Sequence, residues 1–350
     1  MSRPTLSAFF AVVIALFGAA HLSAELVWTP GQGWRIEGGA LAGLSGEDGR
    51  NALEMMNNAR TAEERGSARS AIKGYQKVSK KYPNSIYAAE AIYRTGMLYE
   101  KRREYFKAFD AFQEMVMKYP NTEKFSQVIA EQYRIAQLLL DGTRPYMWGI
   151  IPGFKNRERA LEYFEQVVRN APYSDYAPLS LMNVARGHQK MGNTEEAIDA
   201  LDRMINNYPK NVLTPDAYLK LAQTHSSLVE GAYYDQASTK EAITYYEDYL
   251  IQFPGDTGAG TAEKGLSDMK TMLAQSKMIL ADYYFKYRKN YTAAKVFYNE
   301  AITTYPDSPV AARARTMLTE VDARLAGQPA PAAKDEKPAA PKKKKRFWLF

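Results

Sequence analysis

The chain has 350 residues, of which 46% are hydrophobic, and carries a formal net charge of +7. Residues 334–350 contain seven Lys or Arg and two acids, which gives this segment a net charge of +5 (7 − 2). The rest of the chain therefore carries a net charge of only +2, out of the total of +7. A basic groove that tracks nucleic-acid phosphates is therefore not expected. The chain contains no cysteine, which excludes disulfides, thiolate metal sites and a cysteine nucleophile.

Residues 1–24 have the pattern of an export signal. Arg3 supplies a positive start, and the run from Leu6 to Phe17 contains no charged residue. This apolar run is shorter than the ~20 residues that span a bilayer, and small residues follow it up to Ala24. We expect a signal peptide that directs the chain out of the cytoplasm; the alternative is an uncleaved N-terminal anchor.

Residues 25–50 are predicted to form an extended N-terminal arm. Trp28 and Trp34 flank a Pro30-Gly31 turn, a pattern that is typical of a short extended hairpin. The arm either packs as a strap on the first repeat or forms a hook that binds a partner.

A three-residue pattern recurs six times between residues 71 and 306. An alanine is followed four residues later by a large apolar residue, and eight residues after that by a proline. The sets are Ala71/Tyr75/Pro83, Ala108/Phe112/Pro120, Ala160/Phe164/Pro172, Ala197/Leu201/Pro209, Ala242/Tyr246/Pro254 and Ala294/Tyr298/Pro306. Residues four apart share one helix face, and proline ends a helix. This is the second-helix signature of the tetratricopeptide (TPR) repeat.

The repeats predict an all-α fold: a right-handed α-solenoid of about six TPR-like helical hairpins over residues 51–325. Each hairpin leaves apolar surface that only a neighbour can cover. Successive prolines lie 37, 52, 37, 45 and 52 residues apart, so insertions interrupt some units. A final single helix from Pro309 to about Leu325 should cap the open apolar end.

The insertion in the third hairpin is an apolar loop rich in aromatic residues. It follows a helix that should end near Leu140, and it includes Tyr146, Trp148 and Phe154. Such a loop is either tucked into the solenoid or forms a contact surface.

Residues 326–350 are predicted to be a disordered Ala/Pro/Lys linker that ends in a basic-aromatic tail. The tail would combine electrostatic attraction to an anionic membrane with interfacial aromatic anchors. Its candidate contact residues are Lys342, Lys343, Lys344, Lys345, Arg346, Phe347, Trp348 and Phe350. The alternative is a solvated tail that only increases solubility.

We find no residue pattern that indicates an enzyme, a cofactor or a metal site. Asp256-Thr257-Gly258 matches the aspartic-protease triplet, but here it should join two helices instead of lying in a β framework. His188 and His225 fall on helices of different repeats, and neither has a partner at ligand spacing. A hydrolase that uses these histidines as bases is a remote alternative.

Three segments resemble the BamD/ComL (YfiO) family of outer-membrane protein assembly factors. The resemblance covers about residues 67–310, and its most specific part is the insertion in the third repeat. The segments are Lys81-Tyr82-Pro83-Asn84-Ser85, then Gly149-Ile150-Ile151-Pro152-Gly153-Phe154 before Arg157-Glu158-Arg159-Ala160, and Leu273-Ala274-Gln275-Ser276-Lys277 leading to Tyr305-Pro306-Asp307-Ser308.

The resemblance implies a non-enzymatic periplasmic subunit of the β-barrel assembly machinery, associated with the outer membrane. It would bind the POTRA domains of the barrel-bearing subunit and unfolded outer-membrane proteins. The Tyr-Pro-Asn-Ser pattern also occurs in Tol-Pal-associated periplasmic TPR proteins, so an adaptor of the Tol-Pal or cell-division type is the alternative.

This sequence departs from the family pattern in three ways. Family members are lipoproteins, whereas this chain has no cysteine to carry the lipid; we therefore expect a protein that is not a lipoprotein. One extra repeat is present around residues 178–209, and the last hairpin is reduced to one helix.

The protein-binding candidates come from first-helix positions, which line the concave face of TPR stacks, and from the loop. They are Tyr93, Met97 and Glu100 in the second repeat, Arg134 and Gln137 in the third, and Tyr146 and Trp148 in the loop. The alternative for each is an ordinary exposed or packing side chain.

Overall fold

The structure is a computed structural model that describes residues 25–37 and 46–327. The expected export signal and the basic-aromatic tail lie outside these residues. The chain divides into two compact units, residues 1–204 and residues 205–350.

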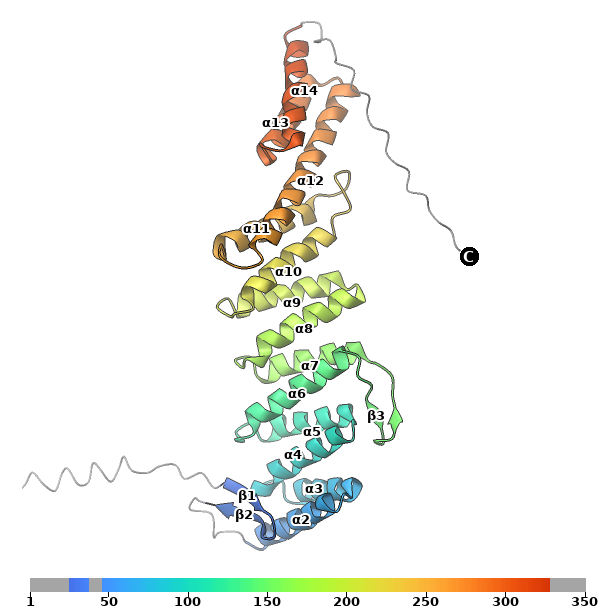
Figure 1. The fold of residues 1–350 in the computed structure, drawn as a ribbon, viewed down its shortest axis with the longest axis vertical. Coiled ribbons are helices and arrows are strands. Elements are labelled where there is room, and N and C mark those ends of the chain that lie inside the picture. The colour runs from blue at the N-terminus through green and yellow to red at the C-terminus, as the bar shows by residue number, and fades with distance from the viewer. Residues whose placement is uncertain (1–24, 38–45, 328–350) are drawn as a thin grey trace, which may run out of the picture. The chain divides into compact units, whose positions relative to one another are not determined.

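The first unit holds a β-hairpin followed by helices (Figure 1). The strands are antiparallel, with Trp28 opposite Trp34. The elements are β1 (Glu25–Thr29), β2 (Gly33–Glu37), α2 (Glu47–Glu64), α3 (Ala68–Lys81), α4 (Ile86–Lys101), α5 (Tyr105–Lys118), α6 (Phe125–Leu140), β3 (Tyr146–Met147), β4 (Ile151–Pro152), α7 (Arg157–Asn170), α8 (Tyr176–Met191) and α9 (Thr194–Asn207), whose last turn falls in the second unit.

The second unit consists of two helical hairpins and a last single helix. Its helices are α10 (Thr214–Ser227), α11 (Ala237–Gln252), α12 (Ala259–Lys286), α13 (Tyr291–Thr304) and α14 (Pro309–Leu325). Each of these helices contacts the next, and α14 also contacts α12. The last helix therefore covers the apolar side of the hairpin before it.

Helices that follow one another in the chain pack side by side within both units. From α2 to α8 each helix contacts the next, and α2 also contacts α4 as α6 contacts α8. The first helices of these hairpins thus share one side of the stack, which we call the inner face. The expected all-α solenoid of helical hairpins is confirmed.

The recurring alanine and its large partner form the core of each hairpin. All six alanines of the pattern are fully buried, and their partners, from Tyr75 to Tyr298, are buried as well. In all six sets the second helix ends two residues before the proline, as at Lys81 before Pro83. The backbone of the intervening residue, Tyr82, has left the helical region, as a residue before proline must.

Within the described part of the chain, no helix combines the length and the hydropathy that a membrane crossing requires.

Candidate functional site

The inner face of α4 carries a buried carboxylate held by two cations. Glu90 accepts a hydrogen bond of 2.8 Å from Nε of Arg94, one turn further along α4. Nζ of Lys124, just before α6, lies 3.4 Å from the other carboxylate oxygen. Because Glu90 is almost fully buried, both contacts are needed to offset the loss of its hydration.

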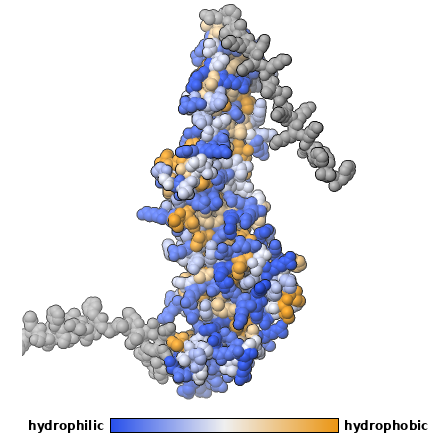
Figure 2. Space-filling model, viewed as in Figure 1, coloured by the Kyte–Doolittle hydropathy of each residue, from blue (hydrophilic) through white to orange (hydrophobic). Residues whose placement is uncertain are grey.

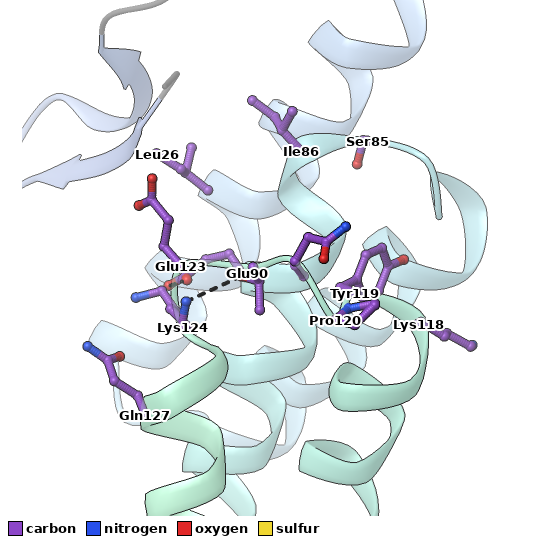
Figure 3. Close-up of a pocket in the computed structure, with 13 residues that line it drawn as sticks. Leu26, Ser85, Ile86, Glu90, Lys118, Tyr119, Pro120, Glu123, Lys124 and Gln127 are labelled. Atoms are coloured by element: carbon purple, nitrogen blue, oxygen red, sulfur yellow. Dashed lines mark hydrogen bonds and ion pairs between the residues drawn. The ribbon is translucent and has the colours of Figure 1, made fainter. Parts of the chain in front are cut away.

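A groove of about 670 Å³ opens beside this cluster (Figure 3). Its walls are the first turn of α4, the turn between α5 and α6, and Leu26 of β1. Ile86 and Leu26 make part of the lining apolar, whereas Glu123, Lys124 and Gln127 bring polar groups. A groove with both kinds of side chain fits an extended polypeptide better than a compact apolar ligand.

A second ion cluster joins α4 to α6 near the other end of α4. The guanidinium of Arg134 contacts the carboxylate of Glu100 and lies 2.8 Å from Oε2 of Glu131. Glu100 is buried, whereas Arg134 is half exposed. Two residues that the sequence analysis selected separately are therefore partners across two hairpins.

The remaining candidates on α4 and α6 lie around these two ion clusters. Tyr93 packs against Phe112, with ring centroids 6.1 Å apart, and Nζ of Lys124 lies 4.8 Å from its ring. Burial raises the pKa of Tyr93, and the nearby carboxylates of Glu131 and Glu90 add to that effect. Met97 is half buried on α4, and Gln137 is exposed on α6.

The structure places the loop candidates Tyr146 and Trp148 away from the groove. Tyr146 and Trp148 lie beside the turn after α4, because the Tyr146 amide donates to the carbonyl of Arg103. The groove is at the opposite end of this 16-residue helix, which spans ~24 Å at 1.5 Å per residue. The candidates on α4 and α6 thus lie along the helices beyond the groove, and the loop candidates form a separate surface of the first unit.

None of the seven protein-binding candidates predicted from the sequence lines the groove. Glu90 lies three residues before Tyr93 and seven before Met97, so helical spacing alone places it on their face. Lys124 and Glu123 could not be found in this way, since they lie in a turn whose position depends on how α6 packs.

The N-terminal hairpin packs on the first repeat. Trp34 is only 3% exposed, and its amide donates a 2.8 Å hydrogen bond to Oδ1 of Asn57 on α2. The guanidinium of Arg60 lies 4.1 Å from the centroid of Trp28, and that of Arg94 lies 5.2 Å from the centroid of Trp34. The arm therefore holds α2 and α4 together from one side.

The residues considered for catalysis have structural contacts. His188 lies 3.4 Å from the side-chain amide of Asn193, and His225 stacks on Tyr245 at 5.3 Å. Asp256 accepts hydrogen bonds from the Tyr249 hydroxyl (2.5 Å) and the Gly258 amide (2.9 Å), which fixes the turn before α12. No group of three or more His, Cys, Asp or Glu that could hold a metal exists among the described residues.

Fold and surface together define a helical-repeat protein of the TPR type with a groove among its described residues. The sequence model of the tetratricopeptide repeat matches residues 55–85 and 90–122. The model of the YfiO family, described as "Outer membrane lipoprotein", matches residues 154–337, which is more than half of the chain. The chain belongs to the YfiO family, and the expected resemblance is confirmed.

Curated relatives carry the name "Outer membrane protein assembly factor BamD". The protein from Caulobacter vibrioides is 28% identical over 131 residues, which are 37% of this chain and 43% of that protein. The protein from Xylella fastidiosa (strain Temecula1) is 24% identical over 42% of this chain and 53% of its own length. The protein from Rickettsia prowazekii is 26% identical over 43% of this chain and 60% of its own length. The chain spans about half the length of the curated relatives it matches.

Proposed function

We propose that the chain is a non-enzymatic TPR scaffold for outer-membrane protein assembly, which acts in the periplasm in association with the outer membrane. The observation that carries the proposal is the YfiO family match over residues 154–337, together with relatives named as assembly factors. Its partners are a β-barrel assembly subunit with POTRA domains and unfolded outer-membrane proteins.

The groove on the inner face of the first unit supports a role in holding extended chains. Its lining combines apolar side chains such as Ile86 with the ion cluster of Glu90 and Lys124, and the cluster of Glu100 and Arg134 lies further along α4 and α6. An unfolded barrel strand alternates apolar and polar side chains, so it presents both kinds of group to one surface. Tyr93, Met97, Glu100, Arg134 and Gln137 are the proposed contact residues.

A photo-cross-linking amino acid at Gln137 tests this role. Gln137 is exposed, so the replacement leaves the core intact. With a purified unfolded outer-membrane protein, we expect cross-links from position 137 that a competing barrel-strand peptide removes. The matched control is the same group at Gln223, exposed on α10 of the second unit. Equal yields at both positions would reject the α4–α6 surface as the site.

For the basic-aromatic tail, which lies outside the described residues, we propose contact with the anionic membrane surface. Its five consecutive basic residues, Lys342 to Arg346, precede Phe347, Trp348 and Phe350. Deletion of residues 334–350 should move the protein from the membrane fraction to the soluble envelope fraction. If the truncated protein fractionates as the intact one does, this proposal is wrong.

A further inference from the structure

The third repeat carries a small β-hairpin that projects from the first unit between α6 and α7 (Figure 1). Strand β3 pairs with β4 in antiparallel fashion, with Met147 opposite Ile151. Trp148 and Gly149 turn the chain at positive φ values of 55° and 72°. This left-handed backbone is rare for a residue other than glycine, and it directs Trp148 to the end of the hairpin.

Backbone and ion contacts fix the base of the hairpin. The Tyr146 amide donates to the Arg103 carbonyl and the Gly153 amide to the Pro145 carbonyl, both at 2.7 Å. The Arg102 side chain donates to the Trp148 carbonyl and is itself held by Glu104 at 2.6 Å. The hairpin is therefore a defined element that presents its tip in one orientation.

The hairpin and Phe154, which follows its base, carry large apolar side chains exposed to solvent. Phe154 is 90% exposed, Ile150 67% and Trp148 61%, and Met147 and Ile151 are exposed as well. Figure 2 shows an orange patch where Figure 1 places the hairpin. A cluster of this kind on a soluble surface marks a place where another molecule covers it. These side chains are therefore not buried in the solenoid, which was one of the two alternatives for this loop.

The charges at the base of the hairpin are mainly positive, although exposed Asp141 and Glu158 flank this segment. Residues 142–157 contain Arg144, Lys155 and Arg157 and no acid, and all three side chains are exposed. Exposed Arg103 adds a fourth cation at the base, where its guanidinium lies 5.4 Å from the Tyr146 centroid. The carboxylate at the base, Glu104, is buried and paired with Arg102 and Lys107.

We propose that this hairpin is a wedge that inserts its tip into the surface of an anionic lipid bilayer. Trp148 and its apolar neighbours would lie at the level of the headgroups, where amphipathic aromatic rings are most stable. Arg144, Lys155 and Arg157 would contact the lipid phosphates. The proposal does not depend on the proposed function or on the tail.

The absence of cysteine allows a test that reads the hairpin alone. Ile150→Cys in the full chain carries one environment-sensitive fluorophore, and Tyr173→Cys, at a fully exposed position after α7, is the matched control. With vesicles that contain phosphatidylglycerol we expect a blue shift at position 150, quenching by bromine-labelled acyl chains, and reversal in high salt. The label at 173 should not change. Vesicles of phosphatidylcholine alone should give a much weaker response.

Variants of the hairpin and its flanking residues provide a second readout. The double change Trp148→Ser and Phe154→Ser should lower the affinity of the chain for vesicles, as the label at position 150 reports it, by at least tenfold. The thermal midpoint of unfolding should not fall. Arg144→Gln with Lys155→Gln should weaken binding to anionic vesicles only. The inference is overturned if anionic vesicles leave the label at position 150 unchanged, or if only a protein partner shields that label.

Discussion

At the scale of single residues, the fold depends on small side chains that let large ones approach. Each alanine of the repeat pattern lies fully buried against a neighbouring helix, and Gly96 and Gly187 take this role on first helices. A Cβ at Gly96 would stand 2.5 Å from Cε1 of Phe112, and one at Gly187 would stand 2.3 Å from Cδ2 of Leu161. These positions have no room for one more methyl group.

Gly96→Ala should therefore destabilise the first unit by about 1–3 kcal/mol, because the Phe112 ring must leave its place between two helices. Urea denaturation followed by circular dichroism measures this change. Gly260→Ala is the matched control, since nothing lies within 4 Å of a Cβ there. It should change stability by less than ~1 kcal/mol, in the stabilising direction. Equal losses in the two variants would contradict the close packing at Gly96.

Glu104 should make part of the stability dependent on pH. Burial opposes its charge, but hydrogen bonds from Lys107 and Arg102 outweigh burial and hold the pKa of Glu104 below its usual value. A lowered pKa in the folded state means that the stabilisation is complete above the unfolded pKa of about 4.3. The stabilisation is then lost as the pH falls through the folded pKa.

The difference in thermal midpoint between the native chain and Glu104→Gln should thus be largest near pH 7 and shrink below pH ~4. Glu114→Gln, which removes a more exposed partner of Lys118, should cause a smaller loss at pH 7. A difference for Glu104→Gln that is the same at pH 7 and pH 3 would show that its ion pairs do not stabilise the fold.

At the scale of elements, local signals predicted the helices better than the site. Proline fixes where each second helix ends, because the residue before it cannot be helical, and this signal needs no tertiary information. The helix from Pro309 to Leu325 has the predicted ends. The contact of Lys124 with Glu90 depends on how α6 stacks on α4, which no local pattern encodes. The projection of the β3–β4 hairpin likewise follows from contacts with Arg102 and Arg103 in another repeat.

The N-terminal hairpin should act as a brace for the first repeat. Trp34 belongs to the same buried cluster as Met56, Tyr75 and Ala91. Trp34→Ala should cost about 3–5 kcal/mol, because it removes a large buried ring and leaves a cavity. Hydrogen exchange should then show faster exchange in α2 and α3. Trp28→Ala, which removes a half-buried ring, should have a smaller effect. If amide exchange in α2 and α3 is unchanged in Trp34→Ala, the hairpin packs on the first repeat without stabilising it.

At the scale of the whole molecule, the repeats and the family could be predicted from sequence, but the partners could not. Six recurrences of one packing pattern specify a solenoid, because each hairpin needs a neighbour to cover its apolar side. The family match over residues 154–337 agrees with the resemblance seen in the repeats after the insertion. Partner choice depends on a few surface side chains, such as Arg134 and Trp148, whose contacts with other molecules leave no periodic signal.

The central claim is that the full chain is a docking scaffold for the assembly of outer-membrane β-barrels. The most direct test is calorimetry of the purified chain with the purified POTRA-domain region of the barrel assembly subunit from the same organism. We predict a saturable complex of defined stoichiometry. No binding to the POTRA region, together with binding to a Tol-Pal component under the same conditions, would contradict the account.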